Sequence, residues 1–445
     1  CIIHMPSTFN GSALGALVFN GGEPGPTISG LTFIQDQPDS VTPTVYPPVI
    51  YAQACPRFNI NQCRIALVYD AIDMRGNSGG AQINDLELSS LHIGIDIDGC
   101  LDVVRIHKLH YWPFAGAGNG TMTSNQRVAM QAATGIKSAR CDGLQMVNCL
   151  FLGSRNELYL YSSTSGTTFG AITTSDFDSN GGFVMSAGQF YITNCTFSLG
   201  DSGSNYAAIT GGEALFNNCY FTWSASPTAN GYITTSGQTM LSNCYFHQSS
   251  DDKTVIYASG GDLVLTGNFI SKASGTYTQP LVHGVGSVSG SASGNFMTPT
   301  SSGTWISLDT DTGFTVVGNT SPGWGIHLPS GTAPNTLMAW NGGGSKANGD
   351  DYAGYFSSDG TTTVKLPSGW SVSRLGTGNY SLTHSLGLTN VIDLLADLSV
   401  DDAANGASAQ LDLTNSTTNA ARIRTNVGAT ATDCGVFFRF KRYRG

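Results

Sequence analysis

The chain has 445 residues, a formal net charge of −10 and only 11% charged residues, while 56 of its residues are glycine. Its hydrophobic content of 40% is ordinary, so a core can form and wholesale disorder is excluded. The shortage of charged helix formers excludes a coiled coil or helical bundle, the acidic balance argues against a nucleic-acid binder, and no run of about 18 apolar residues predicts a membrane span.

The N-terminal part carries no processing signal and already shows short strands. Residues 1–6 have neither the basic flank nor the apolar stretch of a signal peptide, so we expect the chain to be a fragment. Strand patterns follow at Ile28–Phe33, Phe58–Cys63 and Ile83–Leu88. The cysteines form no Cys-x-x-Cys pair and no cluster with histidine, so we expect no metal and no cofactor.

A pattern of asparagine, cysteine, any residue and phenylalanine recurs through the middle of the chain. It occurs at Asn148–Phe151, Asn194–Phe197, Asn218–Phe221 and Asn243–Phe246, and then continues with Gly-Asn in place of Asn-Cys. Its second position falls at residues 149, 175, 195, 219, 244, 268, 295 and 319, a mean spacing of about 24. This period, with short alternating strands, predicts an all-β fold, a parallel β-solenoid whose coils stack about 4.8 Å apart.

Alternation along each strand predicts which side chains of the repeat face inward. Cys195 and Phe197 point one way and Thr196 the other, so the second positions form a ladder of small thiols and amides in the core. Packing then explains the cysteines without a redox role. The expected inward ladder is Cys149, Ser175, Cys195, Cys219, Cys244, Asn268, Asn295 and Asn319.

Two insertions and a change of pattern divide the chain further. The insertions, at 35–56 and 113–134, interrupt the period, and insertions on a solenoid lie on one face, often the binding face. The period stops after Trp324, and 326–367 is a connecting segment. From Ser368 the order of strand, glycine turn and alternating strand predicts an antiparallel module that ends in a strand at Val436–Phe440.

Two parts of the sequence resemble the phage tailspike family. The run from Trp370 to Gly387, with Val372, Arg374 and Tyr380 within it, is similar to the C-terminal β-sandwich of tail fibres and tailspikes. Upstream, the repeat resembles their pectate-lyase-like right-handed parallel β-helix. The resemblance implies a depolymerase β-helix at 1–325, the connecting segment 326–367, and a β-sandwich at 368–445 for trimerisation or receptor binding.

The resemblance also implies a biological setting. A tailspike is a homotrimer on the extracellular virion tail, joined to the rest of the tail by an N-terminal region that is missing here, and it binds a bacterial capsule, exopolysaccharide or O-antigen. Many members depolymerise that glycan by hydrolysis or elimination. The alternatives are a receptor-binding spike that does not cut its glycan and a secreted bacterial carbohydrate enzyme, against which the C-terminal module argues.

A pair of carboxylates predicted on the outer face is the candidate catalytic site for hydrolysis. Asp176 and Asp178 lie two residues apart on one strand, so they face the same way about 6.5–7 Å apart, between the separations of retaining and inverting glycosidases. Two like charges so close raise one pKa, as a general acid needs. Glu157 and Asp201, in loops of adjacent coils, are alternative partners. The simpler interpretation is that these carboxylates only solvate the surface.

A second pair, Asp96 and Asp98, is also expected to face outward. Ile95 precedes the pair and Ile97 lies between its members, and both isoleucines should face the core. It is a further candidate for catalysis. Calcium binding is less favoured, because hard cations want more oxygen ligands than this segment offers. The simplest interpretation is again solvation of an alternating strand.

The segment Arg105–Trp112 is the densest basic and aromatic stretch of this acidic chain. It would attract an acidic polysaccharide, and in a lyase a basic side chain abstracts the proton beside a uronate carboxyl. His107, Lys108 and His110 are the candidates for that role, and a rim of surface side chains is the simpler interpretation. Aromatic residues on neighbouring coils predict sugar-stacking platforms. The expected substrate-binding residues are His107, His110, Trp112, Tyr220, Tyr245 and His247.

Overall fold

The computed structural model is almost entirely β, and its contacts divide it into two units, each described by itself. The first is Cys1–Thr310 with Pro322–Leu328, and the second is Asp311–Ser321 with Pro329–Gly445. No helix within the described part is long and apolar enough to cross a membrane. The structure describes residues 1–6, 9, 14–21, 25–115, 121–179, 182–199, 205–223, 230–248, 252–272, 275–297, 301–310, 313–320, 324–327, 338–339, 351–356, 363–365, 370–384, 394–400, 407–411, 416–417, 420–427, 430–431 and 436–442.

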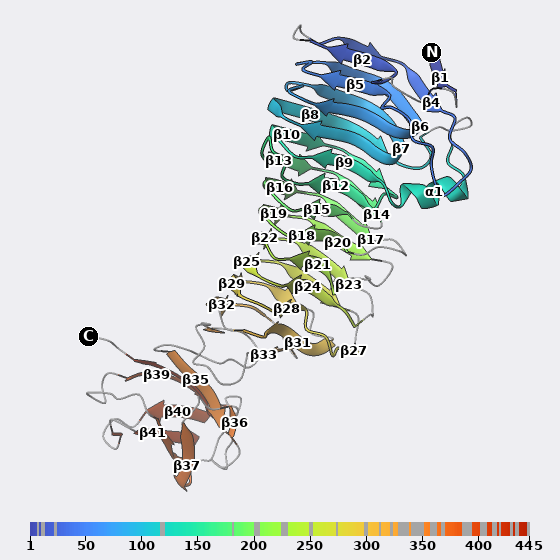
Figure 1. Ribbon diagram of the computed structural model, residues 1–445. Coiled ribbons are helices and arrows are strands. Elements are labelled where there is room, and N and C mark those ends of the chain that lie inside the picture. The colour runs from blue at the N-terminus through green and yellow to red at the C-terminus, as the bar shows by residue number, and fades with distance from the viewer. Residues whose placement is uncertain are drawn as a thin grey trace. The chain divides into compact units, whose positions relative to one another are not determined.

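The first unit is a parallel β-solenoid, as the repeat predicts (Figure 1). Strands pair in parallel with their counterparts in the next coil, so three sheets run along the axis. Sheet I contains β1 (Ile2–Met5), β4 (Thr32–Gln35), β11 (Leu150–Leu152), β14 (Asp176–Ser179), β17 (Thr196–Leu199), β20 (Tyr220–Trp223), β23 (Tyr245–Gln248), β26 (Phe269–Lys272) and β30 (Phe296–Met297). Sheet II contains β3 (Thr27–Ser29), β10 (Cys141–Val147), β13 (Thr168–Thr173), β16 (Gln189–Thr193), β19 (Glu213–Asn217), β22 (Gln238–Ser242), β25 (Gly261–Thr266) and β29 (Val288–Ser293).

Sheet III and three long strands complete the coils. The long strands β6 (Asn59–Arg75), β7 (Gln82–Asp98) and β8 (Cys100–Tyr111) pass around corners and so belong to more than one sheet. Sheet III contains β2 (Leu17–Asn20), β5 (Ile50–Gln53), β9 (Thr134–Ser138), β12 (Asn156–Leu160), β15 (Phe183–Met185), β18 (Ala207–Ile209), β21 (Gly231–Thr235), β24 (Thr254–Ala258), β28 (Val282–Gly284), β31 (Ser301–Leu308) and β33 (Trp324–His327). The short β27 (Gly275–Thr276) pairs with β31.

The first residue of the repeat turns the chain from sheet II into sheet I. Asn148, Asn194, Asn218 and Asn243 all have φ of 53–54°, in the left-handed region, and Gly267 takes the same place with φ 65°. Asparagine is among the residues that adopt this conformation most readily, and glycine adopts it without steric cost. The repeat therefore reads as a corner residue followed by a small residue that points into the core.

The predicted inward ladder is confirmed, since all eight of its side chains are buried. The amide of Asn268 donates to the carbonyl of Leu241 and to Oδ1 of Asn295, both at 2.9 Å, which satisfies these buried polar groups. Burial raises the pKa of the Cys149 thiol to about 11 and that of Cys195 to about 12. The thiols therefore stay protonated at neutral pH, which supports packing as their role.

The two insertions lie against each other, and the second contains a helix that the sequence analysis did not predict. Helix α1 (Ser124–Met130) is capped by Thr123, whose hydroxyl accepts from the Gln126 amide. The Gln126 side chain donates to the carbonyls of Gln37 and Pro38, at 3.2 and 2.9 Å, and so ties the helix to the first insertion. The first insertion is thereby held in place before it leads into β5.

The parallel pairing continues past Trp324, where the sequence repeat ends, because β33 still pairs with β31. In the second unit β32 (Phe314–Val317) pairs in parallel with β34 (Met338–Ala339). Two antiparallel sheets follow, and the hairpin expected after Ser368 and the strand at Val436 are both confirmed. One sheet consists of β35 (Asp351–Phe356), β36 (Thr363–Lys365), β39 (Leu394–Val400) and β43 (Val436–Arg442), and the other of β37 (Ser371–Gly376), β38 (Asn379–Thr383), β40 (Ala407–Leu411), β41 (Ala420–Val427) and β42 (Thr430–Ala431).

Candidate functional site

Asp176 and Asp178 lie on the outer face of sheet I, in the register that the sequence predicts. β14 pairs with β11 and β17 so that Phe177 stacks between Phe151 and Phe197 in the core, while both aspartates are exposed. Burial raises the pKa of Asp178 above its ordinary value, and the charge of Asp176 adds to the rise. One carboxyl of this pair therefore has the direction of shift that a general acid needs.

The aromatic residues further along sheet I form a column in which the rings cover one another. Tyr220 and Tyr245 stack with centroids 5.3 Å apart, Tyr245 and Phe269 at 5.0 Å, and Phe269 and Phe296 at 5.2 Å. The His247 ring lies 6.3 Å from Tyr245. Because both faces of Tyr245 meet neighbouring rings, it offers a sugar only its edge. Within the column, only the end rings keep a face for stacking, so Tyr220 alone of the predicted tyrosines can serve as a platform.

The basic stretch is divided between two sheets. Lys108 has φ 55° and turns the chain at a corner, so Arg105 and His107 face out from the part of β8 paired with β10. The end of β8 pairs instead with β11 in sheet I. There His110 stacks on Trp112 with centroids 4.1 Å apart, and burial lowers the pKa of His110. The corner residue prevents these side chains from acting together.

Of the two predicted partner carboxylates, only Glu157 is among the described residues, and it is not where it was expected. Glu157 lies in strand β12 rather than in a loop, and its side chain is fully buried. The segment pairs with β9 and β15, and its first residues turn into the core, so Glu157 does not reach the outer face. Asp201 lies outside the described residues.

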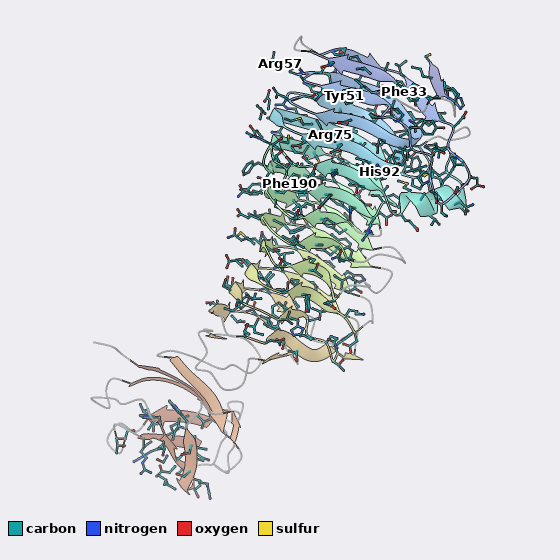
Figure 2. All side chains as sticks on the ribbon, in the orientation of Figure 1. Phe33, Tyr51, Arg57, Arg75, His92 and Phe190 are labelled. Atoms are coloured by element: carbon teal, nitrogen blue, oxygen red, sulfur yellow. The ribbon has the colours of Figure 1, made fainter. Side chains whose placement is uncertain are left out.

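A pocket of about 270 Å³ opens on sheet III, in the coils of β6 and β7. Pro48, from the first insertion, lines it together with charged residues of β6, β7 and β9. Figure 2 labels two of these residues, Arg75 and His92. The outward side chains that cross the pocket are in register, one per coil. Along the axis they are Tyr51, Asp73, Asp96, Lys137 and Tyr159.

Asp73 and Arg75 form a two-bond ion pair at the floor of the pocket. The guanidinium donates from Nε to Oδ1 of Asp73 at 2.9 Å and from Nη2 to Oδ2 at 2.6 Å. This hydrogen bonding raises the pKa of Arg75 further, so the residue stays charged. The fork of the guanidinium fixes the carboxylate in one orientation, which is what a reacting group requires.

Asp96 faces outward as predicted and is as deeply buried as Asp73, but its hydrogen bonding differs. Its side chain is only 10% exposed, and its Oδ1 is buried without a hydrogen-bond partner among the described residues. Its other oxygen lies 3.7 Å from Nε of Arg75. Burial raises the pKa of Asp96, although Lys137 and Arg75 oppose the rise. Asp98, the predicted partner, instead accepts hydrogen bonds from the Ser163 hydroxyl and the Arg140 amide at 2.9 and 3.3 Å.

His92 and Asp70 form a second polar pair at the pocket. Nδ1 of His92 lies 2.8 Å from Oδ1 of Asp70, which also accepts from the Ile93 amide at 3.0 Å. The hydrogen bond to Asp70 raises the pKa of His92, and its ring stacks on Tyr69 with centroids 4.7 Å apart. The carboxylate of Asp70 therefore favours the protonated form of the His92 ring. In the part of the chain that is described, no three His, Cys, Asp or Glu side chains converge as a metal site.

Lys137 lines the pocket, and two tyrosines lie next to it. The Lys137 ammonium lies over the ring of Tyr161, 4.8 Å from its centroid, and Tyr161 stacks on Tyr159 at 5.5 Å. Burial, with the nearby charges of Asp96 and Asp98, raises the pKa of Tyr161 to about 12. The phenol therefore keeps its proton at any physiological pH.

The sequence analysis named Asp96 but missed Asp73, Asp70, His92 and Lys137. A signal was present, because Ile72-Asp73-Met74 repeats Ile95-Asp96-Ile97 at a distance of 23 residues, close to the period. The first insertion interrupts the repeat just before this strand and hides the alignment. The structure supplies the alignment through the pairing of Asp73 with Asp96.

Comparison with known proteins finds likeness only in solved structures. No protein-family model matches the sequence, and no curated protein is similar to it. The tailspike gp61 of Pseudomonas phage phi297 is 9% identical with a TM-score of 0.36, over 85% of this chain and 66% of its own. The tailspike gp49 of Acinetobacter baumannii phage Fri1, described as a capsular polysaccharide depolymerase, is 11% identical with a TM-score of 0.38, over 94% and 79%. The tailspike Gp54 of A. baumannii phage AP22, solved with A. baumannii capsular saccharide, is 11% identical with a TM-score of 0.31, over 93% and 68%.

These three structures are phage tailspikes, the family that the sequence resembles. At these identities and scores the likeness carries no argument about activity, which has to follow from the side chains.

Proposed function

We propose that the protein binds a bacterial surface polysaccharide along its solenoid and hydrolyses it in the pocket of sheet III. In this proposal Asp96 is the general acid that protonates the leaving glycosidic oxygen, and Asp73 is the nucleophile at the anomeric carbon. Paired residues on neighbouring coils lie about 4.8 Å apart, close to the carboxylate separation of retaining glycosidases. Water then releases the glycosyl group from Asp73 while Asp96, now ionised, takes its proton.

The difference between two neighbouring carboxyl groups carries this proposal. Both groups are buried, but Asp96 has a raised pKa and an oxygen without a hydrogen-bond partner among the described residues, whereas Asp73 is fixed by two hydrogen bonds from Arg75. Two carboxyl groups whose surroundings separate their protonation are the pattern of acid and nucleophile in glycoside hydrolysis.

Asp176 and Asp178 are a second candidate pair for the same reaction. The raised pKa of Asp178 favours them, and Tyr220 lies two coils further along sheet I, across the small residues Thr196 and Ser198. A sugar on the face of Tyr220 would lie near this pair. Both carboxyl groups are exposed, however, so their surroundings distinguish them less than those of Asp73 and Asp96.

A polysaccharide lyase is the second candidate function, and the cations of the same pocket favour it. In the pocket, Arg75 and Lys137 would neutralise a uronate carboxylate and His92 would abstract the adjacent proton. The protonated Tyr161, beside Lys137, would supply a proton to the leaving oxygen. His107, Lys108 and His110 remain candidates for the base on the other two sheets. A receptor-binding spike without catalysis is the third candidate.

The sequence resemblance to tailspikes supports the remaining parts of the proposal. The protein would act as a homotrimer on the extracellular virion tail, attached to the rest of the tail. The β-helix at 1–325 would carry the glycan site, and the module at 368–445 would serve trimerisation or receptor binding. Persistence of an oligomer in SDS without heating is a direct check of the trimer.

The test is incubation with a panel of purified bacterial capsular and lipopolysaccharide glycans, read by product size and ultraviolet absorbance. Hydrolysis shortens the chains without absorbance, whereas elimination leaves an unsaturated sugar that absorbs. Shortening with absorbance would overturn hydrolysis in favour of the lyase. A glycan that binds without being shortened would favour the third candidate, a receptor-binding spike without catalysis.

A further inference from the structure

The outward ladder of sheet III runs along the solenoid, the direction in which the proposed function places the polysaccharide. Tyr51, Asp73, Asp96, Lys137 and Tyr159 occupy successive coils, so the ladder spans four steps of about 4.8 Å, or roughly 19 Å. This length exceeds a single sugar unit. A chain that reacts between Asp73 and Asp96 therefore places the next sugar beside Lys137.

Lys137 differs from the other cations of the pocket in its charge partners. Arg75 is paired with Asp73 and Asp96, and His92 with Asp70. Among the ion pairs of the described residues, none includes Lys137. Its ammonium is held over the Tyr161 ring, which attracts a cation through its face but accepts no ordinary hydrogen bond. The ammonium therefore keeps N–H donors for a ligand.

We propose that Lys137 binds an anionic substituent, a carboxylate or a phosphate, on the sugar beside the bond that Asp73 and Asp96 cleave. This inference rests on the proposed function and deepens it, because it makes an acidic polysaccharide the substrate class. The ammonium is a compact charge that suits either anion, and its position one coil beyond Asp96 fixes which sugar must carry it.

The overall charge of the protein makes this local cation decisive. A net charge of −10 repels an anionic glycan in general, but charges more than about 8 Å apart are largely screened at physiological salt. Contacts within the pocket therefore set the preference. Without Lys137, the anionic substituent would meet Asp70, Asp73 and Asp96 with one cation fewer to offset them.

The experiment compares native polysaccharides of the panel with the same glycans after chemical removal of their charge. Carboxyl reduction with carbodiimide and borohydride tests the carboxylate, and removal of phosphate with hydrofluoric acid tests the phosphate. We expect wild type to show kcat/KM at least about 10-fold higher on the native acidic form than on the neutralised form. Lys137→Gln should abolish this preference for the acidic form, whereas Arg57→Gln, which removes one exposed charge outside the pocket, should keep it. The ratio cancels any effect of Lys137 on Asp96, because both substrates need the same acid.

Three outcomes would overturn the inference. The first is a Lys137→Gln variant that keeps the wild-type ratio of kcat/KM on acidic and neutralised glycan. The second is a wild type that cleaves neutral glycans and leaves acidic ones intact. In both cases the proposed hydrolysis would still hold. If wild type cleaves no glycan, the proposed function fails, and retention of the labelled native and neutralised glycans tests Lys137 alone. Equal retention of both forms by wild type and Lys137→Gln would then count against the anion site.

Discussion

The solenoid carries two carboxylate pairs, and they differ in how the fold brings them together. Asp176 and Asp178 are two residues apart on one strand of sheet I, and both are exposed. Asp73 and Asp96 are 23 residues apart and meet because neighbouring coils of sheet III pair in register. The first pair is visible in any reading of the sequence, and the second exists only in the stacked structure.

The comparison shows why pairing across coils suits chemistry that needs two unlike groups. Residues on one strand share the same solvent and nearly the same neighbours. Residues on successive coils have different neighbours. Arg75 therefore donates two hydrogen bonds to Asp73, while Asp96, although equally buried, keeps an oxygen without a hydrogen-bond partner among the described residues. An insertion that covers one coil, as Pro48 does here, adds to the difference.

The largest expected effect separates the two pairs directly. Asp96→Asn and Asp73→Asn should each reduce kcat by about 10³-fold or more, because one removes the acid and the other the nucleophile. Asp176→Asn and Asp178→Asn should change kcat by less than about threefold. The measurement is the release of reducing ends from a cleaved polysaccharide of the panel. Large losses in the Asp176 and Asp178 variants, with activity kept in the other two, would move the site to sheet I.

The stereochemistry of the first product is a second, qualitative separation. Asp73 and Asp96 lie about 4.8 Å apart in the backbone and predict retention, whereas Asp176 and Asp178, at about 6.5–7 Å, extend toward the inverting range. Proton NMR of fresh digests shows which anomer forms before mutarotation. Inversion would exclude Asp73 as a nucleophile even if its substitution abolished activity.

Loss of Arg75 tests whether the ion pair positions Asp73. We expect Arg75→Ala to lower kcat by about 10²-fold with a smaller change in KM, because a carboxylate that moves by an ångström loses its reacting geometry. Arg75→Lys should recover only part of the activity, since lysine lacks the fork. Arg64→Ala is the matched control, because Arg64 pairs with Glu87 at 2.6 Å on another sheet. Equal losses in both variants would indicate a general loss of stability instead.

The solenoid itself was predictable because packing repeats it in every coil. Corner residues such as Asn194 and inward residues such as Cys195 and Phe197 face the same constraint each time, so the sequence records the register. Even the exposure of Asp176 follows from this alternation. The pocket was harder to predict, because only Asp73 and Asp96 recur near the period and no packing constraint repeats its other outward residues. Asp73, Lys137 and Pro48 become neighbours only once the coils are stacked and the first insertion is in place.

The smallest expected effect is on stability, and it again distinguishes the two pairs. The pKa of Asp96 is raised in the folded protein, so the stability this group contributes is complete below its unfolded pKa and is lost as the pH rises through the folded pKa. At pH 8 wild type therefore holds a buried charge that Asp96→Asn lacks, and at pH 3 both side chains are neutral. Melting temperatures at one scan rate should show the stability of Asp96→Asn rising relative to wild type between pH 3 and pH 8. Asp176→Asn relieves only the repulsion between two exposed carboxylates, so its relative gain should be smaller. A variant that loses stability as the pH rises would mean that Asp96 is stabilised as a carboxylate, and it would then be unsuited to serve as the acid.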